Sequence, residues 1–291
     1  SYAWGDDYHD LLSERLQALT AFIEKQIGHS VPHRWYTDTG PVLERDLAQR
    51  AGLGWIGKNT CLIHPHLGSY FLLAEILLGL ELDPDPPFPF DFCGSCTRCL
   101  QACPTSCILP NRTIDARRCI AYLTIEFKGI IPTELRSGMG EWIFGCDICQ
   151  EVCPWNQRFA DPQGEAEQQA AGTFVPRPGV LRPRLVEELS LTLPAFNRKF
   201  KGSPVKRSKR RGYLRNVAVA LGNSLAGRSH SEAVTALRGA LLHDPEPLAR
   251  AHAAWALGRI SGAAARQALE VALSSETDPS VLPEILSALA V

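Results

Sequence analysis

The first part of the chain opens on a helical pattern of apolar and polar positions. Apolar side chains recur at helical spacing over Tyr8–Ile27, which predicts one long amphipathic helix. The short stretch Trp35–Thr37 predicts a strand that ends at the turn-forming residues 38–41. Pro41 suits the first turn of a helix, so a second helix is expected over Val42–Ala51. Together these elements predict an α/β module.

The module closes with an apolar run and a proline-rich linker. The run Tyr70–Leu82 predicts a buried element, and its pattern fits either a strand or a helix. Residues 83–90 carry too many prolines for either, and we place the end of the module at residue 92. The chain begins at Ser1 with residues typical of the middle of a domain, so we expect a further N-terminal part before it.

The last part of the chain is helical and repetitive. Leu214–Asn223 resembles Arg250–Arg259, and the Ala-Leu-Gly triplets within them lie 36 positions apart. Residues 287–290 form a weaker third copy. Alanine-rich helix pairs at this period are typical of a HEAT-like solenoid, which we predict over residues 213–291. An ordinary helical bundle is the alternative.

The composition fits a folded protein whose charges are segregated. Of the 291 residues, 45% are hydrophobic and 21% are charged, which excludes global disorder. The net charge is −1, yet residues 189–231 hold ten Lys and Arg and no acidic residue, so the remainder nets −11. The longest apolar run is too short to cross a bilayer, and no signal peptide opens the chain. We therefore expect a cytoplasmic protein without a membrane partner.

Cysteine spacing carries the strongest chemical signal. Nine of the ten cysteines lie between Cys93 and Cys153. In the cytosol such clustering indicates metal or redox chemistry rather than disulfides. The run from Cys93 to Pro104 reads C-x2-C-x2-C-x3-C-P, the pattern of a bacterial two-cluster ferredoxin, in which the fourth cysteine binds the other cluster. We therefore expect a double [4Fe-4S] domain over residues 93–160.

A second run, Cys146–Pro154, follows the same template but lacks its first cysteine, which would fall at Ile143. Cys119 is the available substitute, and the count then closes at eight ligands for two cubanes. The predicted ligands of cluster 1 are Cys93, Cys96, Cys99 and Cys153, and those of cluster 2 are Cys103, Cys119, Cys146 and Cys149. Zinc, held by two C-x2-C pairs, is the alternative. Cys61 and Cys107 are left over, and we expect both to be small buried hydrophobic side chains.

Several motifs together resemble epoxyqueuosine reductases. They are residues Arg34–Pro41, Ala48–Asn59, Gly68–Tyr70, Asp115–Thr124 and Tyr213–Asn216, with the double ferredoxin run. The resemblance covers nearly the whole chain. It implies an enzyme that binds cobalamin and two [4Fe-4S] clusters and reduces the epoxide of epoxyqueuosine, at the wobble position of certain tRNAs, to give queuosine. The fold is then expected to be α+β: an α/β cobalamin-binding module, a bacterial-ferredoxin-like two-cluster domain and C-terminal α-helical HEAT-like repeats.

The resemblance also implies roles for single residues. Asp38 matches the family's proposed proton donor, which protonates the oxygen released from the epoxide. Its position before Thr-Gly-Pro equally suits a turn or a helix cap. The residues expected to line the cobalamin are Asp38, Leu62, Leu73, Ala121, Cys146 and Asp147.

The basic residues between positions 198 and 215 form the expected tRNA-binding segment, most of it within a linker over residues 161–212. Clustered Lys and Arg bind phosphates, although a solvated basic loop has the same composition. The predicted contacts are Arg198, Lys199, Lys201, Lys206, Arg207, Lys209, Arg210, Arg211 and Arg215. The expected partners are a tRNA with a queuosine-type wobble base and an external low-potential electron donor. We expect a monomer.

Two other functions stay open at this point. A cobalamin enzyme that resembles reductive dehalogenases would act on a small molecule, but such a substrate needs no surface for a polyanion. A ferredoxin-type electron carrier would need only the cluster domain, which leaves Asp38 and the first 92 residues without a purpose. A visible spectrum separates the possibilities, because cobalamin bands beside the iron–sulfur absorption would exclude the carrier.

Overall fold

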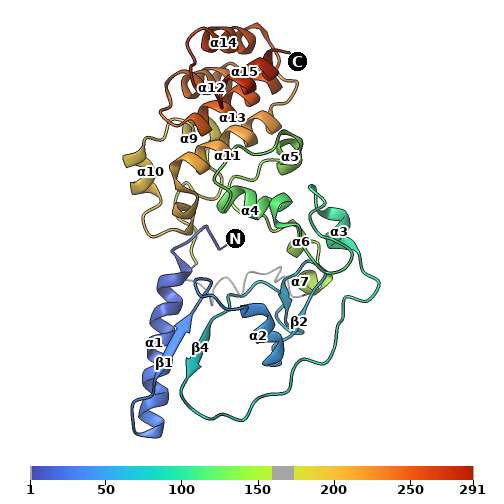
Figure 1. The fold of residues 1–291 in the computed structure, drawn as a ribbon, viewed down its shortest axis with the longest axis vertical. Coiled ribbons are helices and arrows are strands. Elements are labelled where there is room, and N and C mark those ends of the chain that lie inside the picture. The colour runs from blue at the N-terminus through green and yellow to red at the C-terminus, as the bar shows by residue number, and fades with distance from the viewer. Residues whose placement is uncertain (1, 159–173, 291) are drawn as a thin grey trace.

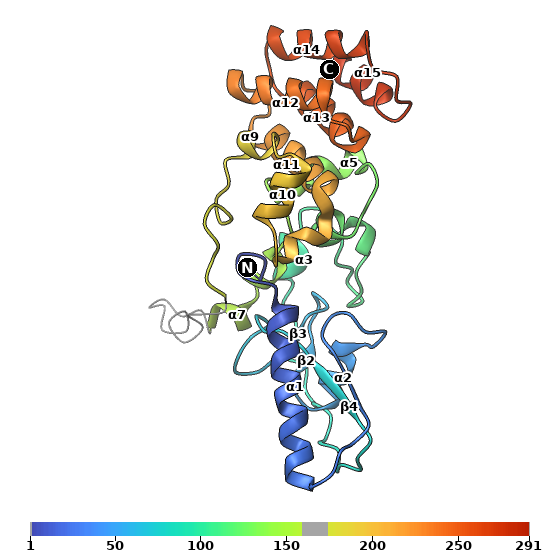
Figure 2. The ribbon, with the colours of Figure 1, turned by 90° about the vertical axis from the view of Figure 1, so that its left-hand side faces the viewer.

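The computed structural model describes residues 2–158 and 174–290 and shows an elongated molecule (Figure 1). The C-terminal helices form one end, the module that contains the long first helix forms the other, and the cysteine-rich region lies between them (Figures 1 and 2). The start of the predicted linker, residues 161–173, lies outside the described residues. Within the described ranges, we find no helix with the length and apolar character needed to cross a membrane.

The N-terminal module is built on one long helix and a two-stranded sheet. Helix α1 (Tyr8–Ile27) has the predicted bounds, and Gly28 ends it in the left-handed region at φ 78°. Strand β1 (His33–Tyr36) pairs antiparallel with β4 (Glu75–Leu78). The apolar run Tyr70–Leu82 therefore contains a strand, and the helical alternative is excluded.

A short helix and a second small sheet complete the module. Helix α2 (Glu44–Arg50) lies within the predicted range, although it begins three residues after Pro41. Strand β2 (Trp55–Ile56) pairs antiparallel with β3 (Leu62–Ile63). Residues 79–97 form no helix or strand, as their prolines predict. The connection from β1 to α2 thus leaves Asp38 on a loop.

The cysteine-rich region consists of short helices joined by tight turns. They are α3 (Arg98–Ala102), η1 (Ala116–Arg118), α4 (Ile120–Ile125), α5 (Thr133–Arg136), η2 (Ser137–Met139), α6 (Ile148–Glu151) and α7 (Pro154–Arg158). Helices α3 and α6, one from each cysteine run, pack against each other. This pairing brings the two halves of the ferredoxin pattern together.

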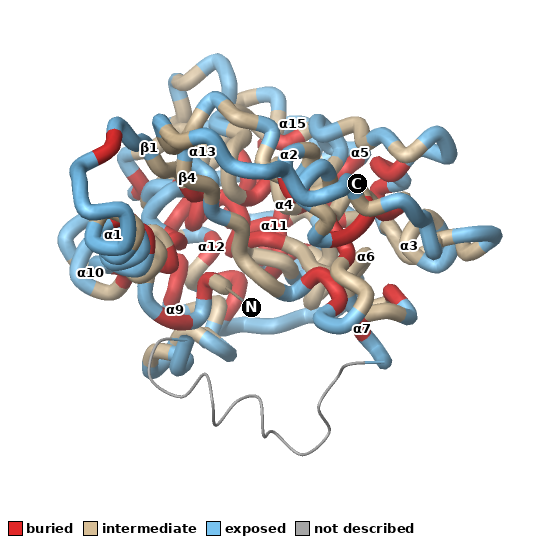
Figure 3. Tube along the Cα trace, turned by 90° about the horizontal axis from the view of Figure 1, so that it is seen from below, coloured by how far each residue is buried: buried red, intermediate tan, exposed pale blue. Residues whose placement is uncertain are grey.

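The C-terminal part is a stack of helices. It comprises α9 (Leu185–Glu188), α10 (Leu193–Lys199), η3 (Pro204–Ser208), α11 (Lys209–Ser224), α12 (Ser231–His243), α13 (Pro247–Arg259), α14 (Ala263–Leu273) and α15 (Leu282–Leu289). Helix α11 packs on α13, and α13 packs on α15. Seen from below, buried residues gather in α11 and α12, whereas α1 is largely exposed (Figure 3).

The glycine of each Ala-Leu-Gly triplet explains the repeat. A Cβ on Gly222 would lie 2.9 Å from the Cα of Ala256, and a Cβ on Gly258 would lie 2.7 Å from the Cβ of Ala288. Each triplet therefore touches the equivalent place in the next copy, and only glycine allows the helices to approach so closely. The predicted HEAT-like repeats are confirmed.

The helix that opens the repeats also anchors the cysteine-rich region. Arg215 on α11 donates to the carbonyls of Phe127 at 2.7 Å and Gly129 at 3.0 Å, and Asn216 donates to the carbonyls of Thr124 at 2.8 Å and Ile143 at 2.9 Å. Arg215 is fully buried, with 0% of its surface exposed. The prediction that Arg215 contacts tRNA is therefore wrong, because its guanidinium caps backbone carbonyls inside the protein.

Candidate active site and iron–sulfur region

A solvent-open hollow lies between the N-terminal module and the cysteine-rich region. Asp38 on the β1–α2 loop, Tyr8 on α1 and Gln150 on α6 line it together with apolar side chains. Those apolar residues include Leu62 and Leu73, two of the predicted cobalamin-lining positions. The sequence reasoning thus placed three residues, distant along the chain, around one space.

Two hydrogen bonds hold Asp38 in a strained loop conformation. Its φ of 53° lies in the left-handed region, which non-glycine residues seldom adopt. The Tyr8 hydroxyl donates to Oδ2 of Asp38 at 2.8 Å, and the Glu44 carboxylate accepts from the backbone N–H of Asp38. The side chain that points into the hollow is therefore fixed both from α1 and from the start of α2.

The hollow disfavours added negative charge. Burial raises the pKa of Tyr8, and its hydrogen bond to Asp38 raises it further. Burial also raises the pKa of Glu44, and the charge of Asp38 adds to that effect. Burial raises the pKa of Glu75 on β4 to about 7, with a further contribution from Glu44. Tyr8 and Glu44, which line the hollow, and Glu75 on the neighbouring strand therefore keep a proton more readily than they do in water.

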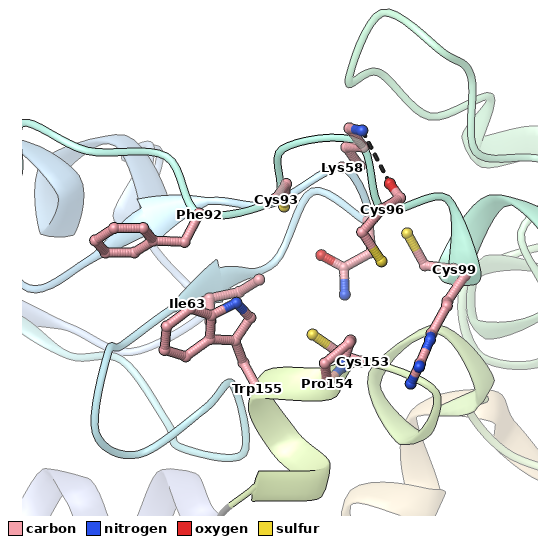
Figure 4. Close-up of a pocket in the computed structure, with 11 residues that line it drawn as sticks. Lys58, Ile63, Phe92, Cys93, Cys96, Cys99, Cys153, Pro154 and Trp155 are labelled. Carbon is pink, nitrogen blue, oxygen red and sulfur yellow. Dashed lines mark hydrogen bonds between the residues drawn. The ribbon is translucent and has the colours of Figure 1, made fainter.

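The four cysteines assigned to cluster 1 surround one cavity (Figure 4). They are Cys93, Cys96, Cys99 and Cys153. The ammonium group of Lys58 donates to the carbonyls of Gly94 at 2.7 Å and Cys96 at 2.9 Å, and so fixes the loop that carries the first two thiols. Four thiols that converge on one space suit a cubane, which takes one thiolate for each iron.

The cysteines assigned to cluster 2 also lie together. The charges of Cys119 and Cys103 act on Cys146, whose pKa is raised to about 11 mainly by burial. The pKa of Cys149 is raised as well, first by a hydrogen bond to Cys61 and then by burial. All four predicted ligands of cluster 2 therefore lie close enough to influence one another. Their shared environment adjoins the hollow, because Cys61 lines that hollow.

The two cysteines left over by the spacing are also found in this environment. The Sγ atoms of Cys107 and Cys103 are 3.3 Å apart, and a hydrogen bond from Cys107 lowers the pKa of Cys119 to about 6. Cys107 is buried as expected, whereas Cys61 is only partly buried and contacts Cys149. Spacing could not reveal this, because neither residue belongs to a C-x2-C pair.

The donor arrangement fits multi-iron clusters better than zinc. Zinc binds thiolates at about 2.3 Å, which places four sulfurs within about 4 Å of one another. Among the described residues, no group of three or more His, Cys, Asp and Glu side chains is arranged to hold a single metal ion. The ferredoxin-type spacing of the cysteines, four of which line one cavity, is instead the arrangement that cubanes take.

The remaining predicted cobalamin positions lie outside the lining of the hollow. Its lining includes neither Ala121 nor Cys146 nor Asp147. Asp147 is nevertheless close, since its charge contributes to the raised pKa values of Tyr2 and Tyr70, and Tyr2 lines the hollow. The space, of about 800 Å³ including its open side, has a mixed lining, in which Leu62, Phe71 and Leu73 lie among polar residues such as Asp38 and Gln150.

The predicted tRNA-binding residues separate into two groups. Arg198, Lys201, Lys206 and Lys209 are exposed. Arg210 forms an ion pair with Asp244 at 2.5 Å, Lys199 pairs with Glu188, and Arg207 pairs with Glu126. The partly buried ion pairs of Arg210 and Lys199 hold α11 and α10 in place, so these two residues stabilise the fold. Arg211 is partly buried.

Backbone contacts bring this basic segment to the hollow. The N–H of Asp7 donates to the carbonyl of Gly202 at 3.0 Å, and the next residue, Tyr8, holds Asp38. The charge of Arg207 also acts on Tyr2 at the rim of the hollow. The part of the basic segment around Gly202, and Arg207, therefore lie close to the hollow that Asp38 lines.

Family models match three parts of the chain. A "4Fe-4S double cluster binding domain" matches residues 92–156, "Epoxyqueuosine reductase QueG, DUF1730" matches residues 1–39, and HEAT repeats match residues 211–290. The epoxyqueuosine reductase of Pseudomonas aeruginosa is 44% identical over 258 residues, which cover 89% of this chain and 68% of that protein. The Escherichia coli enzyme is 40% identical over 258 residues, which cover 89% of this chain and 64% of that protein.

Solved structures agree over almost the full chain. An epoxyqueuosine reductase bound to an epoxyqueuosine-modified tRNA-Tyr stem loop superimposes with a TM-score of 0.88 at 35% identity, covering 99% of this chain and 73% of that one. The Bacillus subtilis enzyme, captured with an aspartate-bearing catalytic loop swung out of its active site, gives a TM-score of 0.86 at 34% identity with the same coverage. By fold, by its cluster-binding domain and by sequence identity over most of its length, this chain belongs to the epoxyqueuosine reductase family.

Proposed function

We propose that the protein reduces the epoxide of epoxyqueuosine, at the wobble position of tRNA, to the alkene of queuosine. Its family consists of enzymes that use cobalamin and two [4Fe-4S] clusters. The observation that carries the proposal is the position of Asp38, which lines a hollow bounded on the other side by Cys61 and Gln150 next to the cluster 2 cysteines. A proton donor and an electron source thus face one space.

The reaction sets clear requirements for the residues around that space. Conversion of an epoxide to an alkene takes two electrons and two protons and releases water. Cobalamin, when bound, supplies a strong nucleophile and reductant. Asp38 gives a proton to the departing oxygen. Because Tyr8 donates to Oδ2 of Asp38, Oδ1 is the oxygen proposed to hand over the proton.

The residues present suit the cofactors. Leu62, Leu73 and Phe71 offer apolar contacts to a large flat ring on the walls of the hollow. The two sets of cysteines predicted from the spacing are proposed as the cluster ligands. The cluster 2 set adjoins the hollow through Cys61, so a cluster held by these cysteines would supply electrons next to the reaction site.

The exposed cations are proposed to bind the tRNA. Arg198, Lys201, Lys206 and Lys209 lie on the segment that contacts the start of α1, so phosphates bound there would bring the anticodon loop to the opening. A base at the wobble position must leave its stack to enter the hollow. The same proposal includes a monomeric enzyme in the cytoplasm, where tRNA is found, with an external low-potential electron donor.

The test is anaerobic turnover of an epoxyqueuosine-modified stem loop by reconstituted enzyme, with the nucleosides identified by mass spectrometry. The proposal expects queuosine to form only when cobalamin and a reductant are both present. Reduced clusters without any queuosine would support an electron carrier. A dehalogenase-like enzyme would leave the stem loop unchanged and would reduce a small organohalide instead.

A further inference from the structure

We infer that the exposed surface over cluster 1 is the docking site for a protein electron carrier whose own redox centre is surrounded by acidic side chains. This inference rests on the proposed function, which needs two electrons per turnover from outside the chain. In each transfer the carrier loses one electron and cluster 1 gains it, and no bond is made or broken. Two such transfers supply one turnover.

The position of cluster 1 makes it the entry point. Cys93, Cys96 and Cys99 come from one short stretch (Figure 4). The residues Gly94, Ser95, Thr97 and Arg98 of that stretch are exposed. Cluster 2 lies on the side of the hollow, as the contact of Cys61 shows. A tRNA bound over the hollow would cover that side. A carrier must therefore approach from the cluster 1 side, where it does not compete with the substrate.

Large aromatic side chains lie exposed beside this loop. Phe90 is 60% exposed and Phe92 is 45% exposed, and their rings stack with centroids 5.7 Å apart. Phe92 also packs at 5.4 Å against Trp155, which lines the cluster 1 cavity. Exposed aromatic residues that gather next to a functional centre are typical of the apolar middle of an interface.

Two arginines lie beside these rings. Arg158 lies over the ring of Trp155 at 5.1 Å, and Arg98 donates to the side-chain carbonyl of Gln157 at 3.2 Å, so neither is neutralised by that contact. Asp91, which stands between Phe90 and Phe92 in the sequence, is paired with Arg112. Arg98 and Arg158 therefore add positive charge to this partly apolar face. An acidic carrier complements such a face and is steered towards it.

The experiment follows cluster reduction in reconstituted enzyme without tRNA. Flavodoxin hydroquinone is mixed anaerobically with the enzyme, and the bleaching of the cluster absorption is recorded by stopped flow. Arg158→Glu and Phe90→Ala are the test variants, because neither residue lines the cluster 1 cavity. Arg238→Glu, an exposed position on α12, is the matched control.

We expect Arg158→Glu to slow reduction by flavodoxin on the order of tenfold at low ionic strength and to flatten its salt dependence. Phe90→Ala should slow it at every salt concentration, and Arg238→Glu should behave as the unmodified enzyme. Methyl viologen radical, a small cation, should reduce neither test variant more slowly than the unmodified enzyme. Unchanged flavodoxin rates in both test variants, or equal slowing with methyl viologen, would overturn the inference. Because no tRNA is present, failure here is distinct from failure of epoxide reduction.

Discussion

The helical repeats and the N-terminal module differ in how they are held together. Helix α13 buries seven of its 13 residues, whereas α1 buries three of its 20. The repeats have a continuous apolar core, and the module has two sheets of two strands each. The reaction site thus lies in the part of the molecule with less apolar core, next to the part with the continuous one. Changes in the repeats are therefore expected to act on stability, and changes in the module are expected to act on the reaction.

The largest expected effect comes from removing one ligand of cluster 2. Cys119→Ala should leave about four irons per chain in place of about eight after anaerobic reconstitution, because one cubane loses a ligand and the other keeps all four. Turnover should then fall to background. Iron and sulfide analysis, with electron paramagnetic resonance of the reduced protein, measures this.

Cys107→Ala is the matched control, since its sulfur lies 3.3 Å from that of Cys103 but is not assigned as a ligand. It should keep both clusters. The ligand assignment is wrong if Cys107→Ala loses a cluster and Cys119→Ala does not.

The next effect concerns the exposed cations beside the hollow. Replacing Arg198, Lys201, Lys206 and Lys209 together by Gln should weaken tRNA binding and flatten its dependence on salt. The log–log slope should fall by about 0.7–0.9 for each phosphate contact that is lost. Binding of a stem loop at several salt concentrations measures this. Arg238→Gln on α12 serves as the control, and an unchanged slope in the fourfold variant would place the RNA surface elsewhere.

A change within the repeats should affect stability and spare the chemistry. In Gly258→Leu, a side chain would enter the contact with Ala288, where even a Cβ comes within 2.7 Å. We expect a loss of about 1–3 kcal/mol in stability, typical of overpacking. Chemical denaturation followed by circular dichroism measures it. Gly239→Leu, where a Cβ would meet nothing within 4 Å, is the control. Equal stability of the two variants would contradict the stacking of the triplets.

The smallest effect is a pH dependence in the module. Burial raises the pKa of Glu75 to about 7, above its ordinary value near 4.5. Between these two pH values Glu75 keeps its proton in the folded chain but has lost it in the unfolded chain. The free energy of unfolding therefore falls as the pH rises through this window. Glu75→Gln should therefore raise Tm by about 2 °C at pH 8 and leave it unchanged at pH 4. An equal change at both pH values would show that Glu75 does not titrate in this way.

The parts of the fold that sequence could predict are those where local spacing is decisive. Helix α1 has the predicted bounds because its apolar period and the terminating Gly28 agree. Cys93, Cys96 and Cys99 lie close together because their spacing places them on one tight stretch, whereas Cys153 joins them where the second cysteine run packs against the first. The Ala-Leu-Gly triplets align because each glycine has the same contact to make.

The parts that sequence could not predict depend on contacts between distant segments. The run that contains Glu75–Leu78 fits helix or strand by its period, and only pairing with β1 decides. Arg215 stands in a basic run, yet it turns inward because its guanidinium donates to the carbonyls of Leu123, Phe127 and Gly129 in the cysteine-rich region. Cys61 likewise comes to lie beside cluster 2 through its contact with Cys149, which is distant in the sequence.

The most direct test of the account is a comparison of Asp38→Asn with Asp46→Asn, whose carboxylate forms an exposed pair with Arg50 on α2. Both proteins are reconstituted with clusters and cobalamin, and the rate of queuosine formation on a modified stem loop is measured in a single turnover. Asp38→Asn keeps the shape of the side chain and removes its acid. The account predicts a rate lower by about 10²–10⁴-fold with full cofactor absorption, while Asp46→Asn reacts at the normal rate. A near-normal rate in Asp38→Asn would contradict it and would leave Asp38 as a residue of the turn.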